Sequence, residues 1–239
     1  MGKLDGKIAL VTGASRGIGY HTALALAAQG AHVIALARTV GGLEELDDAI
    51  QQAGGTATLV PLDLQDFDAL DRLGASIDER WGKLDIFIAN AGILGGLSPL
   101  GHIEPKTFDK IMAINVTANW RLARSLDPLL KASDAGRVLL MSSGAAQSCK
   151  AFWGGYSISK AALEALGKTW ANESANTNLK INMVNPGATR TAMRAVAMPG
   201  EDPDTLPTPV DVAAKLVDLV SGSNTRNGEL FDVRKDNWV

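Results

Sequence analysis

Short, continuously apolar runs recur along the chain and alternate with longer segments of helical periodicity. The first run is Ile8-Ala9-Leu10-Val11 and the second covers residues 33–36, and neither contains a polar residue. A strand with one face in water alternates apolar and polar residues, whereas a strand covered on both faces is apolar throughout. The runs therefore predict a parallel sheet buried between two layers of helices.

Strand-like and helix-like segments follow one another over most of the sequence. The predicted strands cover residues 7–11, 32–37, 56–61, 84–89, 136–141, 180–184 and 229–233. Apolar residues spaced three and four apart predict helices between them, such as residues 18–29, 43–53 and 67–80. Repeated strand–helix–strand units need right-handed crossovers. The expected fold class is therefore α/β, a doubly wound Rossmann-type parallel sheet of about seven strands with helices on both faces.

The end of the chain has clear helix punctuation. Thr208 can cap the last helix, Pro209 suits its first position, and Gly222 is expected to end it. Residues 198–207 contain several prolines and acidic residues without periodicity, which predicts a loop. This loop lies too near the C-terminus to join two domains, so residues 1–239 are expected to form a single domain.

Composition and charge argue against several classes of partner. A net charge of −3 and a pI near 5.6 give no electrostatic footprint for nucleic acid. No apolar stretch is long enough to span a bilayer, so no membrane partner is expected. The single cysteine, Cys149, and the lack of a signal-peptide pattern favour a cytoplasmic location. The three histidines lack ligand-like spacing, so no metal site is predicted.

A glycine-rich turn joins the first strand to the first helix. Residues 12–19 read TGASRGIG, with Gly13, Gly17 and Gly19 at a spacing that differs from the usual G-x-G-x-x-G pattern. Glycines let the backbone approach a pyrophosphate, which then lies at the free N–H groups of the helix. A plain strand-to-helix turn is the alternative interpretation of this segment.

Further motifs follow in a fixed order, and together with the turn they resemble the short-chain dehydrogenase/reductase family over nearly the whole chain. The matching positions are Asn90-Ala91-Gly92, Asn115, Ser143, the YSISK segment with Tyr156 and Lys160, Asn185-Pro186-Gly187, and Thr191. The resemblance implies an oxidoreductase that transfers a hydride between a nicotinamide cofactor and a carbonyl or alcohol substrate. The chain departs from the family after residue 228, where the common V-D-G-G turn is replaced.

The resemblance also implies catalytic roles. Tyr156 would be the general acid/base, Ser143 would bind the substrate oxygen, Lys160 would hold the nicotinamide ribose, and Asn115 would hold a water for proton relay. The residue chemistry agrees, because Tyr156 and Lys160 are four apart near a helix start and share a face. An ammonium close to a phenol should lower its pKa from about 10.

The residues after the second strand favour NADP over NAD. An acidic residue there would bind the ribose of NAD, but the strand ends in Ala37 and is followed by Arg38. Arg16 lies in the glycine turn, and two guanidinium groups suit a 2′-phosphate. The full expected cofactor set is Gly13, Ser15, Arg16, Gly17, Ile18, Gly19, Arg38, Asp63, Asn90, Ala91, Gly92, Tyr156, Lys160, Pro186, Gly187 and Thr191.

Several questions stay open at this level. Two alternatives to an oxidoreductase stay open. One is a protein that senses NADP without catalysing a reaction, and the other is a lyase or epimerase on the same scaffold. The substrate is not assigned, although Trp153, Met193 and Met198 are candidates for its pocket. Family members pair through the helices expected at residues 108–130 and 157–176, which implies a homodimer or homotetramer.

Overall fold

The computed structural model describes residues 2–239 and contains one central sheet. Its strands are β1 Ile8–Thr12, β2 His32–Ala37, β3 Thr56–Pro61, β4 Ile86–Ala89, β5 Arg137–Met141, β6 Lys180–Asn185, β7 Leu230–Asp232 and β8 Asn237–Trp238. The strand order is β3-β2-β1-β4-β5-β6-β7-β8, and all pairs are parallel except β7 with β8. The predicted doubly wound Rossmann-type fold is confirmed, with one strand more than expected.

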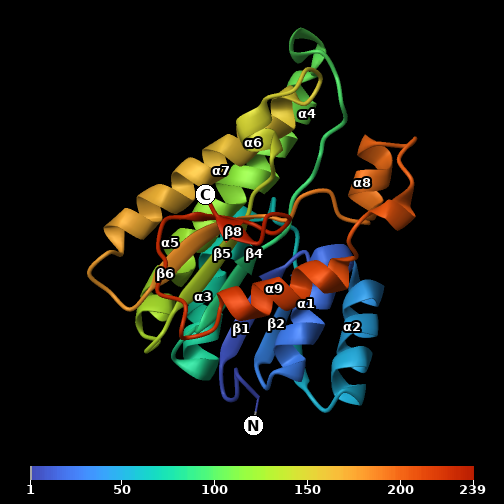
Figure 1. Cartoon of the computed structure of the whole chain (residues 1–239). Coiled ribbons are helices and arrows are strands. Elements are labelled where there is room, and N and C mark those ends of the chain that lie inside the picture. The colour runs from blue at the N-terminus through green and yellow to red at the C-terminus, as the bar shows by residue number, and fades with distance from the viewer. Residues whose placement is uncertain (1) are drawn as a thin grey trace.

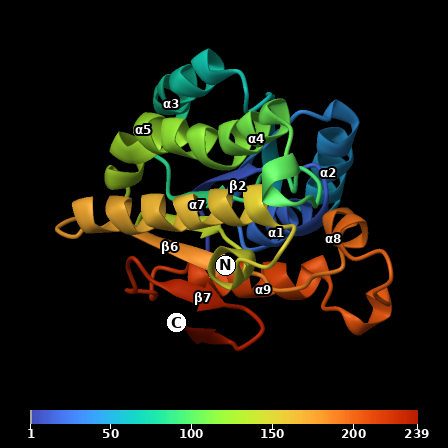
Figure 2. The same cartoon turned by 90° about the horizontal axis from the view of Figure 1, so that it is seen from above.

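Helices cover both faces of the sheet (Figure 1). Their bounds are α1 Gly17–Ala28, α2 Val40–Gln52, α3 Phe67–Trp81, α4 Pro105–Met112, α5 Ala118–Lys131, α6 Ala145–Ser148, α7 Gly154–Glu173, α8 Ala192–Ala197 and α9 Pro209–Leu219. Short 3-10 turns occur at Leu100–His102 and Pro203–Thr205, and a π-helical turn occurs at Ala113–Thr117. Seen from above, α3, α5 and α7 lie on one side and α1 and α9 on the other (Figure 2).

Two apolar cores correspond to these two layers. One core joins the sheet to α3, α5 and α7 through residues such as Leu70, Leu122 and Leu163. The other joins it to α1, α2 and α9 through residues such as Leu26 and Leu216. Every residue of β1 and β4 is buried, which explains why their sequences show no alternation. No helix among residues 2–239 is long and apolar enough to cross a membrane.

The expected last helix is present with a complete N-terminal cap. The Thr208 side chain accepts from the Asp211 N–H, and the Asp211 carboxylate accepts from the Thr208 N–H, which together form a capping box. The helix ends at Leu219 rather than at Gly222. The expected loop at residues 198–207 is mostly irregular and includes one 3-10 turn.

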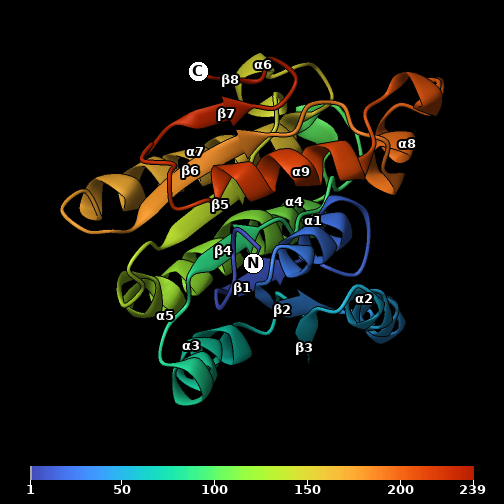
Figure 3. The same cartoon turned by 60° about the horizontal axis from the view of Figure 1, so that its bottom comes forward.

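The last strand, β8, is not among the strands predicted from the sequence. β8 turns back after β7, and its Trp238 lies edge-on against Phe231 with 5.2 Å between ring centroids. Arg226 lies over the Trp238 ring at 5.7 Å from its centroid. The replaced family ending is therefore built into the sheet as an antiparallel edge strand (Figure 3).

The sheet topology decides where a site can form. β1 connects to β2 on one side, and the chain then crosses back to place β4 on the other side of β1. The chain therefore leaves the neighbouring carboxyl ends of β1 and β4 toward helices in different layers, α1 after β1 and α5 after β4. Ligands of open α/β sheets bind at such a switch point. The glycine-rich turn follows β1 directly at this point.

Close packing of α3 against α5 gives a test of the fold. A Cβ added at Gly74 would lie 2.1 Å from the Ser125 carbonyl oxygen, so the Gly74→Ala variant must separate the two helices. We expect its free energy of unfolding to fall by about 1–3 kcal/mol. Gly41→Ala is the matched control, because a Cβ there meets nothing within 4 Å. Equal stability of the two variants in urea unfolding would contradict the close packing.

Candidate active site

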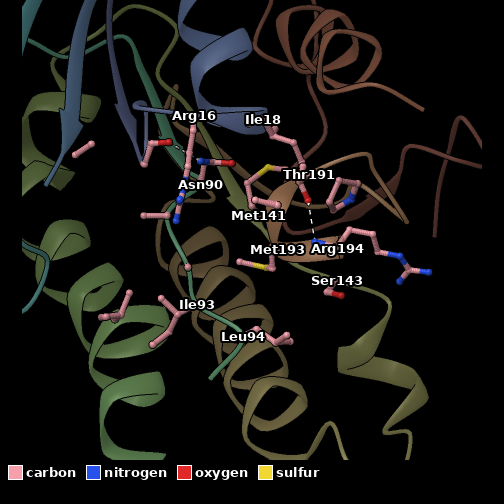
Figure 4. A pocket seen from close by; sticks show the side chains of 18 of the residues that line it. Arg16, Ile18, Asn90, Ile93, Leu94, Met141, Ser143, Thr191, Met193 and Arg194 are labelled. Carbon is pink, nitrogen blue, oxygen red and sulfur yellow. Dashed lines mark hydrogen bonds between the residues drawn. The ribbon is translucent and has the colours of Figure 1, made fainter. Parts of the chain in front are cut away.

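A cavity of about 780 Å³ opens at the carboxyl ends of the strands. Most of the predicted site residues line it: Gly13, Ser15, Arg16, Gly17, Ile18, Arg38, Asp63, Asn90, Ala91, Gly92, Ser143, Tyr156, Lys160, Pro186, Gly187 and Thr191. Gly19 and Asn115 are the two predicted residues that lie behind its wall instead. Figure 4 shows Arg16, Ile18 and Asn90 on one side of the cavity and Ser143 and Arg194 on the other.

The glycine turn needs its glycines for two different reasons. Gly13 and Gly17 have φ of +68° and +59°, a conformation that costs a residue with a Cβ free energy. Gly19 has no such φ, but a Cβ there would lie 2.3 Å from the Gly13 carbonyl oxygen and 2.4 Å from Asn90 Nδ2. Gly19 therefore lets the first turn of α1 pack directly against the loops that follow β1 and β4.

Hydrogen bonds lock these two loops together. Asn90 Nδ2 donates to the Thr12 carbonyl oxygen at 3.0 Å and to that of Gly13 at 3.4 Å. The Ala91 N–H donates to Thr12 Oγ1 at 3.1 Å. The Asn90-Ala91-Gly92 segment thus fixes the glycine turn, which explains why the two motifs occur together.

The N-terminus of α1 faces the same cavity without a side-chain cap. Arg16 occupies the N-cap with an extended backbone, and its side chain accepts no hydrogen bond because a guanidinium has only donors. Helix N-terminal N–H groups attract anions when no side chain satisfies them. The uncapped first turn of α1, which lines the cavity through Arg16, Gly17 and Ile18, fits the pyrophosphate of a dinucleotide.

The second positive group lies at the end of β2. Arg38 and Asp63 both line the cavity, and Arg38 Nη1 lies 3.7 Å from Asp63 Oδ2. Both side chains are at least 40% exposed, so this pair is weak and the guanidinium stays accessible. The neighbouring Ala37 is buried and carries no charge that could repel a phosphate.

Tyr156 lies in the first turn of α7 and faces the cavity near Ser143, which follows β5. Burial raises the pKa of Tyr156 above its ordinary value, and a hydrogen bond with Ser143 opposes the rise. The expectation that this pKa is lowered is wrong, because desolvation of the phenolate moves it the other way. Lys160 Nζ lies 5.6 Å from the centre of the Tyr156 ring.

Lys160 is itself buried, with 3% of its surface exposed. Its Nζ donates to the Met141 carbonyl oxygen at 2.6 Å. Burial lowers the pKa of Lys160 to about 8, and the negative charge of Glu164 limits this fall. The lysine can therefore change its protonation state near neutral pH, which an exposed lysine does not do.

Asn115 lies at the centre of the π-helical turn between α4 and α5. Its side-chain Oδ1 accepts from the Ile93 N–H at 2.9 Å, and its Nδ2 donates to the Ile93 carbonyl oxygen at 2.9 Å and to Ser159 Oγ at 3.0 Å. A Cβ added at Gly92 would approach both Asn115 Oδ1 and Lys160 Nζ. The asparagine therefore fixes the β4 loop beside Lys160. π-turns inside helices are frequent at functional sites.

The turn after β6 closes the third side of the cavity. Asn185 Oδ1 accepts from the N–H groups of Gly144 and Gly187, at 3.0 and 3.1 Å. Gly187 has φ of +71°. Thr191 caps α8 by accepting from the Arg194 N–H at 3.2 Å. The predicted Pro186-Gly187 and Thr191 positions thus come together with the β5 loop that carries Ser143.

Apolar side chains form the open end of the cavity next to Tyr156. Leu94, Trp153, Met193, Val196 and Ala197 line it, and the Trp153 ring lies 6.1 Å from the Tyr156 ring. Of the candidates for this pocket, Trp153 and Met193 line it, whereas Met198 packs against the apolar cluster around Tyr156.

Arg194, which was not predicted from the sequence, also lines the cavity. Its guanidinium forms a two-pronged ion pair with Glu201, at 2.5 and 2.7 Å. Residues seven apart in a segment without regular periodicity give no pairing signal in a sequence.

Comparison with known proteins agrees with this geometry. The family model for short chain dehydrogenases matches residues 7–202. The uncharacterized oxidoreductase YciK of Escherichia coli K12 is 37% identical over 235 residues, which is 97% of this chain and 93% of the relative. A short chain dehydrogenase from Shigella flexneri 2a, solved in complex with NADP, has a TM-score of 0.93 at 37% identity and covers 97% of this chain and 98% of its own. An uncharacterized NAD-dependent oxidoreductase of Mycobacterium tuberculosis CDC 1551 is 32% identical over 206 residues, 80% of this chain and 74% of the relative.

The fold and the cavity define a dinucleotide-binding oxidoreductase of the Rossmann type. The chain belongs to the short chain dehydrogenase family.

The close approach at Gly19 predicts a binding defect. In Gly19→Ala the added Cβ must displace the Gly13 carbonyl or the Asn90 amide, which hold the turn in place. We expect the Kd for NADPH to rise about tenfold or more, because the displaced turn no longer aims its N–H groups at the pyrophosphate and a hydrogen bond to a charged group contributes about 1.5–3 kcal/mol. Fluorescence titration measures the Kd, with Gly41→Ala as the control. Unchanged affinity in Gly19→Ala would contradict the role given to this turn.

Proposed function

We propose that this protein is an NADP(H)-preferring oxidoreductase that transfers a hydride between the cofactor and a carbonyl or alcohol carbon, with Tyr156 as general acid/base. One observation carries the proposal: a single cavity is lined by the glycine turn, Arg16 and Arg38 as well as by Ser143, Tyr156 and Lys160. A dinucleotide bound along the first group would bring its reactive end to the second group. When bound, the cofactor supplies the hydride.

The chain's own groups manage the proton. Tyr156 donates its phenolic proton to the substrate oxygen during reduction, and its raised pKa keeps that proton in place at neutral pH. Ser143 donates a second hydrogen bond to the same oxygen as charge develops there. Lys160 holds the ribose of the cofactor and stabilises the phenolate that Tyr156 becomes. Asn115 keeps the β4 loop beside Lys160, and a water there would connect the lysine to solvent.

Preference for NADP rests on the two guanidinium groups and on the relatives. Arg16, at the N-cap of α1, and Arg38, directly after β2, line the same cavity. Ala37 stands where a carboxylate would favour NAD. Asp63 lies beside Arg38, where it would contact the adenine. The Shigella relative solved with NADP supports this choice, and the mycobacterial relative named as NAD-dependent shows that related proteins differ.

The apolar end of the cavity favours a substrate with an uncharged body. Leu94, Trp153 and Met193 offer it no charge, and the cation of Arg194 is paired with Glu201. A sensor and a non-redox lyase or epimerase stay the alternatives. The presence of Ser143, Tyr156 and Lys160 in one cavity favours the oxidoreductase over a sensor. The intact Gly13, Gly17 and Gly19 favour it over a lyase or epimerase.

Location and assembly stay predictions. We propose a cytoplasmic protein that pairs through α5 and α7. Trp120 on α5 and Ile158 on α7 are exposed apolar residues on those two helices.

The proposed acid gives the first test. Tyr156→Phe keeps the ring in its packed position but removes the proton donor, so turnover should fall by about 10²–10⁴-fold. The Kd for NADPH should hardly change. NADPH absorbance with a panel of uncharged aldehydes and ketones measures turnover, and fluorescence titration measures binding. If Tyr156→Phe keeps near-normal turnover on a substrate of the wild type, the mechanism is wrong.

The cofactor preference gives the second test. Arg38→Ala should weaken NADPH binding by about tenfold or more, because a hydrogen bond to a charged group contributes about 1.5–3 kcal/mol. NADH binding should change little. Ala37→Asp should turn the preference toward NADH by repelling the 2′-phosphate. Dissociation constants of both cofactors are the measurement. Equal weakening of NADPH and NADH in Arg38→Ala would give the arginine a structural role, and a wild type that prefers NADH would overturn the assignment.

A further inference from the structure

Glu164 is a buried carboxylate that none of the roles above uses. It lies on α7 one helical turn after Lys160, and only 8% of its surface is exposed. Burying a charged side chain costs free energy unless hydrogen bonds and an opposite charge compensate it. The position therefore needs an explanation beyond filling space, which an apolar residue would do at lower cost.

Its hydrogen bonds come from the segment that carries Ser143. Ser142 Oγ donates to Glu164 Oε1 at 2.5 Å. Gln147 Nε2, on α6, donates to Oε1 at 2.7 Å and to Oε2 at 2.8 Å. Ser142 precedes Ser143 directly, and α6 begins two residues after it. One carboxylate thus connects α7, which carries Tyr156 and Lys160, to both sides of Ser143.

These donors are neutral, so they do not cancel the charge of Glu164. Within residues 2–239, the ionisable groups that the structure brings to Lys160 are Tyr156 and Glu164, both on α7. The other elements bring uncharged groups near Lys160. β5 supplies the Met141 carbonyl oxygen, which accepts from Lys160 Nζ. The π-helical turn supplies the Asn115 amide, which lies beside Gly92 as Lys160 Nζ does. Desolvation lowers the pKa of Lys160, and the attraction of Glu164 opposes that fall.

We propose that Glu164 is a positioning residue for the reaction. Its charge compensates the buried ammonium of Lys160, and its hydrogen bonds hold the Ser143 segment against α7. The proposal rests on the proposed function for its catalytic consequence, but the charge coupling between Glu164 and Lys160 is a property of the folded chain alone.

The pH dependence of reduction tests the catalytic consequence. We expect kcat/KM for an uncharged carbonyl, at saturating NADPH, to fall as Lys160 loses its proton, near pH 8 in the wild type. Glu164→Gln keeps the size of the side chain but removes its charge. The alkaline limb should then move to lower pH by about one unit or more, because an opposite charge nearby favours the protonated amine.

Two control variants separate charge from hydrogen bonding. Ser142→Ala removes one donor and keeps the charge, so its alkaline limb should stay at the wild-type pH. Gln147→Ala removes the other donor and also keeps the charge of Glu164, so its limb should likewise stay at the wild-type pH. A limb that moves as far in Ser142→Ala or Gln147→Ala as in Glu164→Gln would overturn the charge role.

A stability measurement tests the coupling without any activity. Lys160 has a folded pKa of about 8, below its ordinary value of 10.5. The cost of burying the protonated amine is therefore fully present below pH 8 and is relieved as the pH rises toward 10.5. Loss of Glu164 should raise that cost, so Glu164→Gln should be more destabilising at about pH 7 than at about pH 10.

Urea unfolding of four proteins isolates this effect: the wild type, Glu164→Gln, Lys160→Met and the two combined. We expect a favourable coupling between residues 160 and 164 at about pH 7 that disappears by about pH 10. The coupling is absent or independent of pH if Glu164 only ties helices together, and that result overturns the inference. A pH-dependent coupling together with an unshifted rate profile would support the electrostatic coupling between the two residues. The same result would overturn the catalytic consequence of that coupling and contradict the role proposed for Lys160. If Glu164→Gln does not fold, Glu164→Leu, which also removes the charge, takes its place in the cycle.

Discussion

A parallel sheet covered on both faces leaves only its strand ends for polar chemistry, and the whole site follows from this constraint. β1 and β4 are fully buried, so the chain can expose backbone N–H groups and side chains only where these strands end. Both ends meet at the switch point, where the Asn90 amide holds the glycine turn and Gly19 leaves no room for a Cβ. Because the two loops support each other, the dinucleotide region is built before any ligand arrives.

Burial also governs the chemistry at the other end of the cavity. The same enclosure raises the pKa of Tyr156 and lowers that of Lys160 to about 8, since both neutral forms are favoured away from water. A protonated Tyr156 suits the donation of a proton, so the direction of its shift is consistent with the acid role in reduction. Glu164 limits how far the same effect can neutralise Lys160.

Features that depend on local sequence could be predicted, and features that depend on distant partners could not. The bounds of β2, a buried apolar run, and of β3, which is exposed or half-buried, agree with the predicted ranges. The positive φ of Gly13 and Gly17 agrees with the glycine pattern. β8 was missed because two residues give no periodicity, and its partner Phe231 is needed to define it. The pKa of Tyr156 was predicted in the wrong direction because sequence spacing showed the nearby ammonium but not the desolvation.

The contact between Lys160 and Met141 fixes the place of the buried amine. An ammonium has three N–H donors, and the Met141 carbonyl accepts only one of them. The bond fixes the amine at the end of β5, where Lys160 lines the cavity, and leaves the other donors for the ribose contact proposed above. The fold thus orients the amine through β5 and sets its charge through Glu164 on α7.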